Sequence, residues 1–220
     1  MILKHITICL LFLFLMNACS HESSDIKLDS KTKSEIKDLL LCDNFEFTQE
    51  NDSLIITVDN SKLSNEVKRK MGSSVVSLSL YDFFYKNNTI ANTQTIFGVA
   101  FKDDKSSYYN SLEILASASA LNKRVDFTIR DLIKGKKDQV NFYFPLTDSL
   151  IEKSKIEWQK VKTFGIFGFE TTQITIDETT YPSIVFKYLL FPLKKEIWIY
   201  IDKETGKILY LLDAATLNEK

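Results

Sequence analysis

Hydrophobic residues recur along this chain at two spacings, which separate the predicted helices from the predicted strands. Spacings of three and four residues indicate helices with one buried face at residues 33–43, 61–86 and 117–134. Alternating apolar and polar positions, or short apolar runs between turn residues, indicate strands. These strands are expected at residues 45–48, 54–59, 93–101, 108–115, 163–177, 183–191, 196–202 and 207–213.

Capping and turn residues mark where these elements begin and end. Thr32, with Glu35 three residues later, forms a capping-box pattern at the start of the first helix. Gly135 follows the third helix as a helix-ending residue, and Gly206 closes a predicted hairpin turn that requires a positive φ. The small residues Gly72–Ser74 interrupt the second helix, so they either allow close packing against a sheet or bend the helix.

The order of these elements predicts an α+β fold in which antiparallel sheets are packed by helices. Residues 32–116 have the pattern helix, hairpin, helix, hairpin, and residues 117–220 have helices followed by a curved antiparallel sheet. Shorter helical pieces are expected at 141–146 and 149–161. The strand at 196–202 is apolar on both faces, so we expect its sheet to be covered twice. Ile197, Ile199 and Ile201 lie on one face of it, and Trp198 and Tyr200 lie on the other.

An uncharged apolar run occupies residues 6–16 near the start of the chain. Its length suits the hydrophobic region of a secretory signal and is too short for a membrane span, which needs ~20 apolar residues. We therefore expect a signal at residues 1–18. Residues 19–31 are polar and rich in Ser, Lys and Asp, a composition that predicts a flexible tether.

The stretch Leu15–Cys19 resembles the lipobox of bacterial lipoproteins. An apolar residue lies a few positions upstream and Ala18 directly precedes the cysteine, although Asn17 is uncommon at its position. The resemblance implies cleavage between Ala18 and Cys19 and acylation at Cys19, with two or three chains for stable anchoring. Ser20 stands where enteric lipoproteins kept at the inner membrane have aspartate, which favours the outer membrane. An ordinary secretory signal and an uncleaved anchor stay open as alternatives.

The charges of the chain are nearly balanced, with 28 Lys and Arg residues against 29 Asp and Glu residues. Because no basic excess would attract a phosphate backbone, nucleic-acid binding is not expected. The short basic clusters Lys68–Lys70 and Lys194–Lys195 are interpreted as solvated surface, with contact to lipid head groups as the alternative. The six glycines form no glycine-rich phosphate loop.

Cysteine and histidine are scarce, which excludes several chemistries. Cys9 would leave with the signal and Cys19 would be acylated, so Cys42 would be the remaining thiol and no intrachain disulfide is expected. Cys42 ends an apolar run, and we interpret it as a small buried residue rather than a nucleophile. The two histidines, His5 and His21, precede the predicted body. This argues against Ser-His-Asp and Cys-His catalysis and against the usual zinc and copper sites.

Acidic residues offer the remaining route to catalysis or metal binding. Paired carboxylates can hydrolyse glycosidic bonds, but no spacing selects a pair, so a solvated face explains these residues better. Two acidic turns could hold calcium, but neither has EF-hand spacing, and turn formation explains both. The candidate carboxylates are Asp126, Asp131, Glu157 and Glu170, and the acidic turns contain Asp103 and Asp104, and Asp202 and Glu204.

Four segments of the second unit follow one another as VDFTIRDLIKGK, NFYF, IEWQKVKTFGIFG and IDKETGKILYLLD. In this order, residues from about 117 to 213 resemble the small bacterial envelope domains of the nuclear transport factor 2-like class. The resemblance implies helices packed into a curved sheet that forms a cone. Catalysis in that class uses acidic residues or histidine inside the cone, and histidine is missing here. The cone mouth would be lined by Trp158, Phe167, Phe169, Tyr188, Trp198 and Tyr200.

Together these patterns predict a lipid-anchored protein of the bacterial cell envelope that acts as a non-catalytic binding or interaction module. An accessory subunit, a scaffold and an inhibitor all fit this description, with an envelope protein as partner and no cofactor. The chain has 16 Phe, 9 Tyr and 2 Trp residues. These could line a pocket for a small molecule or lipid, but filling of a sheet core is the interpretation we favour. A carboxylate-based hydrolase is the second alternative.

Overall fold

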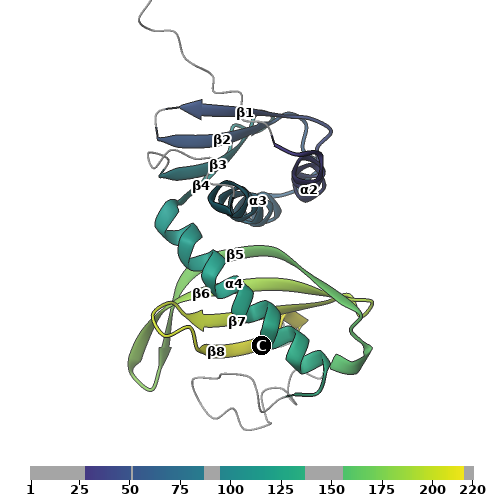
Figure 1. Cartoon of the computed structure of the whole chain (residues 1–220), viewed down its shortest axis with the longest axis vertical. Coiled ribbons are helices and arrows are strands. Elements are labelled where there is room, and N and C mark those ends of the chain that lie inside the picture. The colour runs from purple at the N-terminus through teal and green to yellow at the C-terminus, as the bar shows by residue number, and fades with distance from the viewer. Residues whose placement is uncertain (1–27, 51, 87–94, 137–155, 216–220) are drawn as a thin grey trace, which may run out of the picture.

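The computed structural model describes residues 28–50, 52–86, 95–136 and 156–215. These residues form two four-stranded sheets and three α-helices, which confirms the predicted α+β class (Figure 1). The predicted signal, Cys19 and the helical piece at 141–146 lie outside the described residues. In chain order the elements are α2 (Ser30–Leu40), β1 (Phe45–Glu50), β2 (Ser53–Val58), α3 (Glu66–Lys86), β3 (Ile96–Phe101), β4 (Ser107–Ser111), α4 (Leu112–Ile133), the 3₁₀ turn η3 (Trp158–Lys160), β5 (Thr163–Ile176), β6 (Thr179–Phe191), β7 (Lys195–Asp202) and β8 (Ile208–Asp213).

The first sheet has the strand order β1-β2-β3-β4 and is covered on one face by α2 and α3 (Figure 1). The hairpins β1–β2 and β3–β4 are antiparallel, as expected. The strands β2 and β3 are parallel, because α3 connects them and returns the chain to the same end of the sheet. This parallel pair is the exception to the expected antiparallel pairing.

The middle of helix α3, residues 71–80, is buried on almost every side, because it lies between α2, the first sheet and β5 of the second sheet. A Cβ added to Gly72 would lie 3.0 Å from the backbone oxygen of Leu39, so this glycine permits the close approach of α2. Met71 of the same helix lies against Gly168 of β5. The small residues of α3 therefore serve close packing, the first of the two roles considered for them.

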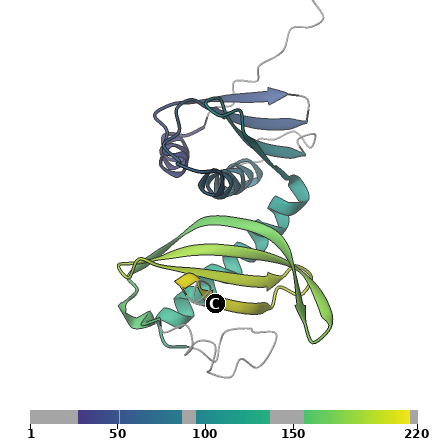
Figure 2. The same ribbon diagram turned by 180° about the vertical axis from the view of Figure 1, so that it is seen from behind.

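The second sheet is an antiparallel meander with the order β5-β6-β7-β8. Its edges, β5 and β8, do not pair with each other, so the sheet is open rather than closed into a barrel. Helix α4 crosses one face of the sheet, and β5 is the strand nearest to α3 (Figures 1 and 2). The predicted turn with Gly206 is present, and this glycine has φ +68°.

The start of α4 corrects the predicted strand at 108–115. Ser111 caps the helix, and its side-chain oxygen accepts a hydrogen bond from the backbone N–H of Ile114 at 3.4 Å. The strand therefore ends at Ser111, and the expected boundary between residues 116 and 117 falls inside α4.

The start of α2 also differs from the prediction. Its N-cap is Asp29, whose carboxylate accepts hydrogen bonds from the backbone N–H of Thr32 at 2.8 Å and from the Thr32 hydroxyl at 3.0 Å. Thr32 thus lies inside the helix rather than at its cap. Leu28 is buried in the core, so the folded body begins before Thr32.

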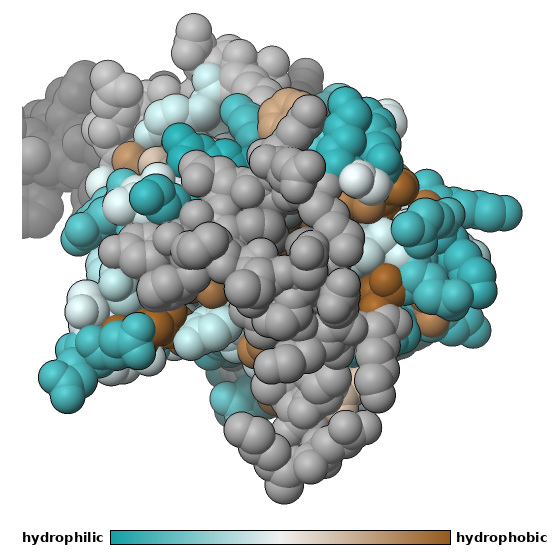
Figure 3. Space-filling model, turned by 90° about the horizontal axis from the view of Figure 1, so that it is seen from below, coloured by the Kyte–Doolittle hydropathy of each residue, from teal (hydrophilic) through white to brown (hydrophobic). Residues whose placement is uncertain are grey.

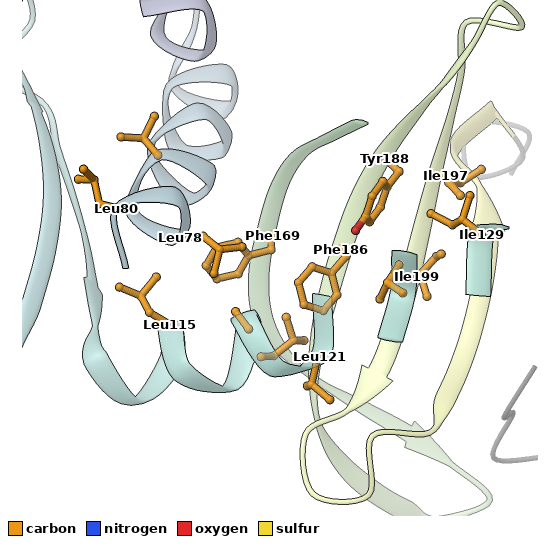
Figure 4. Packing of buried hydrophobic residues seen from close by; sticks show 14 of the residues in the cluster. Leu78, Leu80, Leu115, Leu121, Ile129, Phe169, Phe186, Tyr188, Ile197 and Ile199 are labelled. Carbon is orange, nitrogen blue, oxygen red and sulfur yellow. The ribbon is translucent and has the colours of Figure 1, made fainter. Parts of the chain in front are cut away.

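One hydrophobic core connects the two sheets. Leu78 of α3 lies beside Phe169 of β5, and Leu115 and Leu121 of α4 continue the cluster toward Phe186 of β6 (Figure 4). All of these side chains are less than one-tenth exposed. The two predicted units therefore share their packing, with α3 and α4 contributing to both.

Candidate functional site

The aromatic residues predicted to line a cone mouth are divided between the two faces of the second sheet. Tyr188 faces α4, whereas its neighbour Lys187 pairs with Trp198 on the opposite face. The Lys187 ammonium lies 4.2 Å from the centre of the Trp198 ring, a cation–π contact. Phe169 lies on the α4 face, Tyr200 lies on the Trp198 face, Phe167 is at a β-bulge, and Trp158 is buried in η3.

The α4 face of the sheet is occupied by the helix. Tyr188 is 1% exposed, and its hydroxyl lies 2.6 Å from Asn122 Oδ1 and 2.8 Å from Asp126 Oδ1 of α4. Burial raises the pKa of Tyr188 above its usual range, so the phenol stays protonated. Of the six aromatic residues predicted to line the cone mouth, only Phe169 lines one of the two hollows described below, and the other five line neither.

The four candidate carboxylates do not converge. Asp126, on α4, accepts a hydrogen bond from the hydroxyl of Tyr188, and Asp131 lies further along the same helix. Glu157 forms an ion pair with Lys160 at 2.7 Å. Glu170 lies on β5 and pairs with lysines. Within the described residues, no three acidic, His or Cys side chains are grouped as a metal site would require.

Both acidic turns have structural roles. The guanidinium of Arg69 lies 2.6 Å from Asp103 Oδ2 and 2.5 Å from Asp104 Oδ2. Hydrogen bonds from Arg69 hold the pKa of Asp103 below its usual value. Arg69 is 8% exposed, which corrects its assignment to solvated surface. In the second turn, the Asp202 carboxylate accepts from the backbone N–H groups of Glu204 at 3.2 Å and of Thr205 at 3.3 Å.

A cleft of about 330 Å³ lies where the two sheets meet. The edge strand β4 forms one wall, the edge strand β5 forms the other, and α3 and the first turn of α4 complete the lining. Hydroxyl and amide groups predominate among its side chains. The lining residues are Lys70, Ser74, Ser107, Tyr108, Tyr109, Asn110, Ile114, Phe169, Glu170 and Thr171.

A second hollow of about 500 Å³ lies next to the first. Ile114 and Thr171 line both hollows, so together they form one groove that runs from the edge of β5 onto the neighbouring part of β6, which we call the junction groove. The second hollow is lined by Ser111, Glu113, Ile114, Thr171, Thr172, Gln173, Pro182, Ser183 and Lys203.

Ion pairs lie at the two ends of the junction groove. At the α3 end, Glu170 accepts from Lys70 at 3.3 Å and from Lys187 at 2.8 Å, and these lysines lower the pKa of Glu170 against the opposing effect of burial. At the other end, Lys203 pairs with Glu113 at 2.9 Å. The groove is therefore nearly neutral, with polar walls between charged ends.

Sequence reasoning missed the junction groove because its walls come from distant parts of the chain. The signal that was available is the run Thr171–Ile176, which is rich in β-branched residues, free of charge and proline, and placed in a long strand. Nothing in the sequence indicates that this strand lies at an edge facing β4.

Seen from below, the described residues that are visible are largely hydrophilic, with small hydrophobic patches between them (Figure 3). Scattered apolar residues of this kind are ordinary for a protein surface. Among the described residues, no helix combines the length and hydrophobicity needed to cross a membrane.

Comparison with protein-family models, with curated proteins and with solved structures finds no match to this chain.

Proposed function

We propose that the chain is a lipoprotein of the bacterial envelope, anchored through Cys19, whose folded body acts as a non-catalytic binding module. The lipobox resemblance of Leu15–Cys19 supports the anchor. The junction groove is the observation that supports binding, because it combines concave shape, hydrogen-bonding walls and an open strand edge. A protein partner in the envelope, with the chain as accessory subunit, scaffold or inhibitor, fits such a surface.

The groove favours recognition of a partner over chemistry on a substrate. Its acidic residues, Glu170 and Glu113, are both engaged by lysines and lie at opposite ends. General acid–base catalysis needs a donor and an acceptor near one reacting atom. The groove walls instead offer hydroxyl, amide and backbone groups, which bind polar partners.

The small-molecule alternative has less support from the geometry. Ligand pockets are usually enclosed and lined mainly by apolar side chains. The first hollow, at about 330 Å³, has hydroxyl and amide side chains beside Ile114 and Phe169, and the aromatic residues Tyr188 and Phe186 are buried in the core and line neither hollow. Binding of an extended polar partner uses these features better than binding of a lipid does.

The anchor is tested by metabolic labelling with an acyl-chain analogue. Cys19→Ala is expected to abolish labelling and to release the protein from membranes or leave its signal uncleaved. Cys9→Ala is the matched control, because it removes a cysteine from the predicted signal without touching the acylation position. Labelling of the Cys19→Ala protein at the level of the unaltered protein would overturn the lipoprotein assignment.

The binding role is tested by gentle affinity purification of the lipidated protein from its own envelope, followed by native mass spectrometry. A stoichiometric protein companion is the expected result. A bare protein that carries a few hundred daltons of unexplained mass, an order of magnitude set by ligand-sized pockets, would favour the small-molecule alternative instead.

A further inference from the structure

The edge of β5 in the junction groove presents backbone groups that are ready for another strand. The hairpin turn between β5 and β6 has positive φ at Asp177 and Glu178, which makes Ile176 and Thr179 a hydrogen-bonded pair. By alternation, the N–H and C=O groups of Thr171 and of every second residue beyond it point away from β6. The outward direction of the Phe169 N–H, which reaches Ser74, agrees with this register.

Protection of this edge stops where the groove begins. At Phe169 the outward N–H is satisfied by the Ser74 hydroxyl at 3.0 Å. Beyond it, the outward groups of Thr171 and Gln173 make no hydrogen bond to the described part of the chain. The segment Thr171–Ile176 contains neither charge nor proline, the usual devices that keep an edge from pairing.

The other sheet edges are better protected. Strand β5 has 14 residues, whereas β1 and β8 have 6 each and β4 has 5. Short edges offer few backbone groups, and β1 also carries Glu46 and Glu50. The uncharged segment Thr171–Ile176 of the longer strand β5 therefore borders the junction groove, which the short edge strand β4 lines on the opposite side.

The walls of the groove select a single extended segment over a second copy of this chain. Antiparallel pairing of two β5 strands about Gln173 would place the second copy's hairpin turn beside Phe169 and Glu170. That position is occupied by α3, which bonds Phe169 through Ser74 and Glu170 through Lys70. The strand β4 forms the opposite wall, so a whole second sheet has no room behind the added strand.

We propose that the junction groove binds an extended segment of a partner protein, which adds as a strand to the edge of β5 at Thr171 and Gln173. This inference rests on the proposed binding function and names the chemistry of the partner. An added strand turns alternate side chains to opposite faces. Those on the α4 side meet Ile114, which favours apolar residues, and those on the other side meet the ion pair of Lys70 and Glu170, which favours polar ones. The partner segment is therefore alternating and strand-forming.

The test uses the lipidated protein in detergent micelles and a library of random linear peptides displayed on phage. The selected peptides are synthesised and their affinities measured. Backbone hydrogen exchange is then followed by NMR with and without peptide. The peptide is expected to slow exchange at Thr171 and Gln173, while Thr172 and Ile174, whose N–H groups already bond β6, change little.

Variants at one position separate backbone recognition from side-chain recognition. Gln173→Pro removes an outward N–H, which an edge strand tolerates, and is expected to weaken peptide binding about tenfold. Gln173→Ala keeps the N–H and is expected to bind within about twofold of the unaltered protein. Thermal unfolding of each variant verifies that it is folded, and the exchange experiment does not depend on either variant.

The proposal would be overturned by the absence of any enriched peptide, by equal affinity for the Gln173→Pro and Gln173→Ala proteins, or by protection that appears away from β5. Slow exchange at Thr171 and Gln173 in the free protein, with twice the expected mass, would assign the edge to a second copy and overturn it as well. A stoichiometric companion found by native mass spectrometry that leaves exchange at β5 unchanged would preserve the binding function while refuting this site.

Discussion

The backbone N–H of Phe169 donates a 3.0 Å hydrogen bond to the hydroxyl of Ser74, a residue 95 positions earlier in the chain. The Ser74 hydroxyl in turn donates to the backbone oxygen of Met71 at 2.7 Å, which fixes its orientation. This pair joins α3 to the edge of β5. It also defines the point at which the edge stops being covered and the junction groove begins.

Replacing Ser74 by alanine tests how much this hydrogen bond contributes to the stability of the fold. Ser74→Ala leaves the buried Phe169 N–H without a partner, which is expected to lower the free energy of unfolding by ~1–3 kcal/mol in urea titration. Ser117→Ala is the control, because the Ser117 hydroxyl bonds only within α4, to the backbone oxygen of Glu113, in an exposed position. Its effect should stay within ~0.5 kcal/mol. Equal effects of the two substitutions would contradict the assigned role of Ser74.

Two glycines of β5 provide a matched pair for the contact with α3. A Cβ at Gly168 would clash with the Met71 side chain, whose Cβ would lie 2.9 Å away, so Gly168→Ala is expected to cost ~1–3 kcal/mol of stability. A Cβ at Gly165 meets nothing within 4 Å, and Gly165→Ala should leave stability unchanged or slightly raised. Thermal unfolding of both variants measures the difference, and a harmless Gly168→Ala would show that α3 and β5 are packed less closely than described.

Acid stability should depend on the Arg69–Asp103 pair. The two hydrogen bonds from Arg69 hold the pKa of Asp103 below its ordinary value of 3.8, so at low pH the unfolded chain binds more protons than the folded one. The stabilisation is therefore complete above that ordinary value and is lost as the pH falls through the lower folded-state pKa. Urea titrations across this range should show a shallower acid decline for Asp103→Asn than for the unaltered protein. Parallel declines would refute the coupling.

The thiol of Cys42 should be unreactive while the protein is folded. Its side chain is 6% exposed and burial raises its pKa, so the nucleophilic thiolate is scarce; the burial predicted from sequence is confirmed. A thiol reagent is expected to label the lipidated protein in urea but not in buffer. Ser34→Cys, on the exposed side of α2, supplies a positive control that reacts in buffer. Rapid labelling of Cys42 in the native protein would reopen its interpretation as a reactive residue.

The strands of the second sheet could be predicted because their local pattern agrees with their final surroundings. Ile197, Ile199 and Ile201 alternate with larger aromatic residues, and the three isoleucines do share the buried face. Which face would receive α4 could not be predicted, because Trp198 and Tyr200 make the opposite face apolar too. For this reason, the aromatic residues predicted to line one cone mouth lie on both faces of the second sheet.

The junction between β4 and α4 shows where local propensity misleads. Residues 108–115 contain aromatic and branched side chains that suit a strand, but the cap at Ser111 and the acidic Glu113 in the first turn start a helix there. These two residues were the available signal for the boundary. The junction groove beside them forms because β4 lies opposite β5. Tertiary packing determines this arrangement, so the local sequence pattern could not predict it.

The burial of α3 also has a consequence for the order of events during synthesis. The side of α3 that carries Met71, Ser74 and Leu78 packs against β5. This strand is synthesised much later than the helix, since Phe169 of β5 follows Ser74 by 95 positions. A chain made from its N-terminus therefore emerges with a complete first sheet whose central helix still exposes an apolar side. Until β5 is synthesised, the packing partner of that side is missing, so the packing of the first half is completed only by the second half.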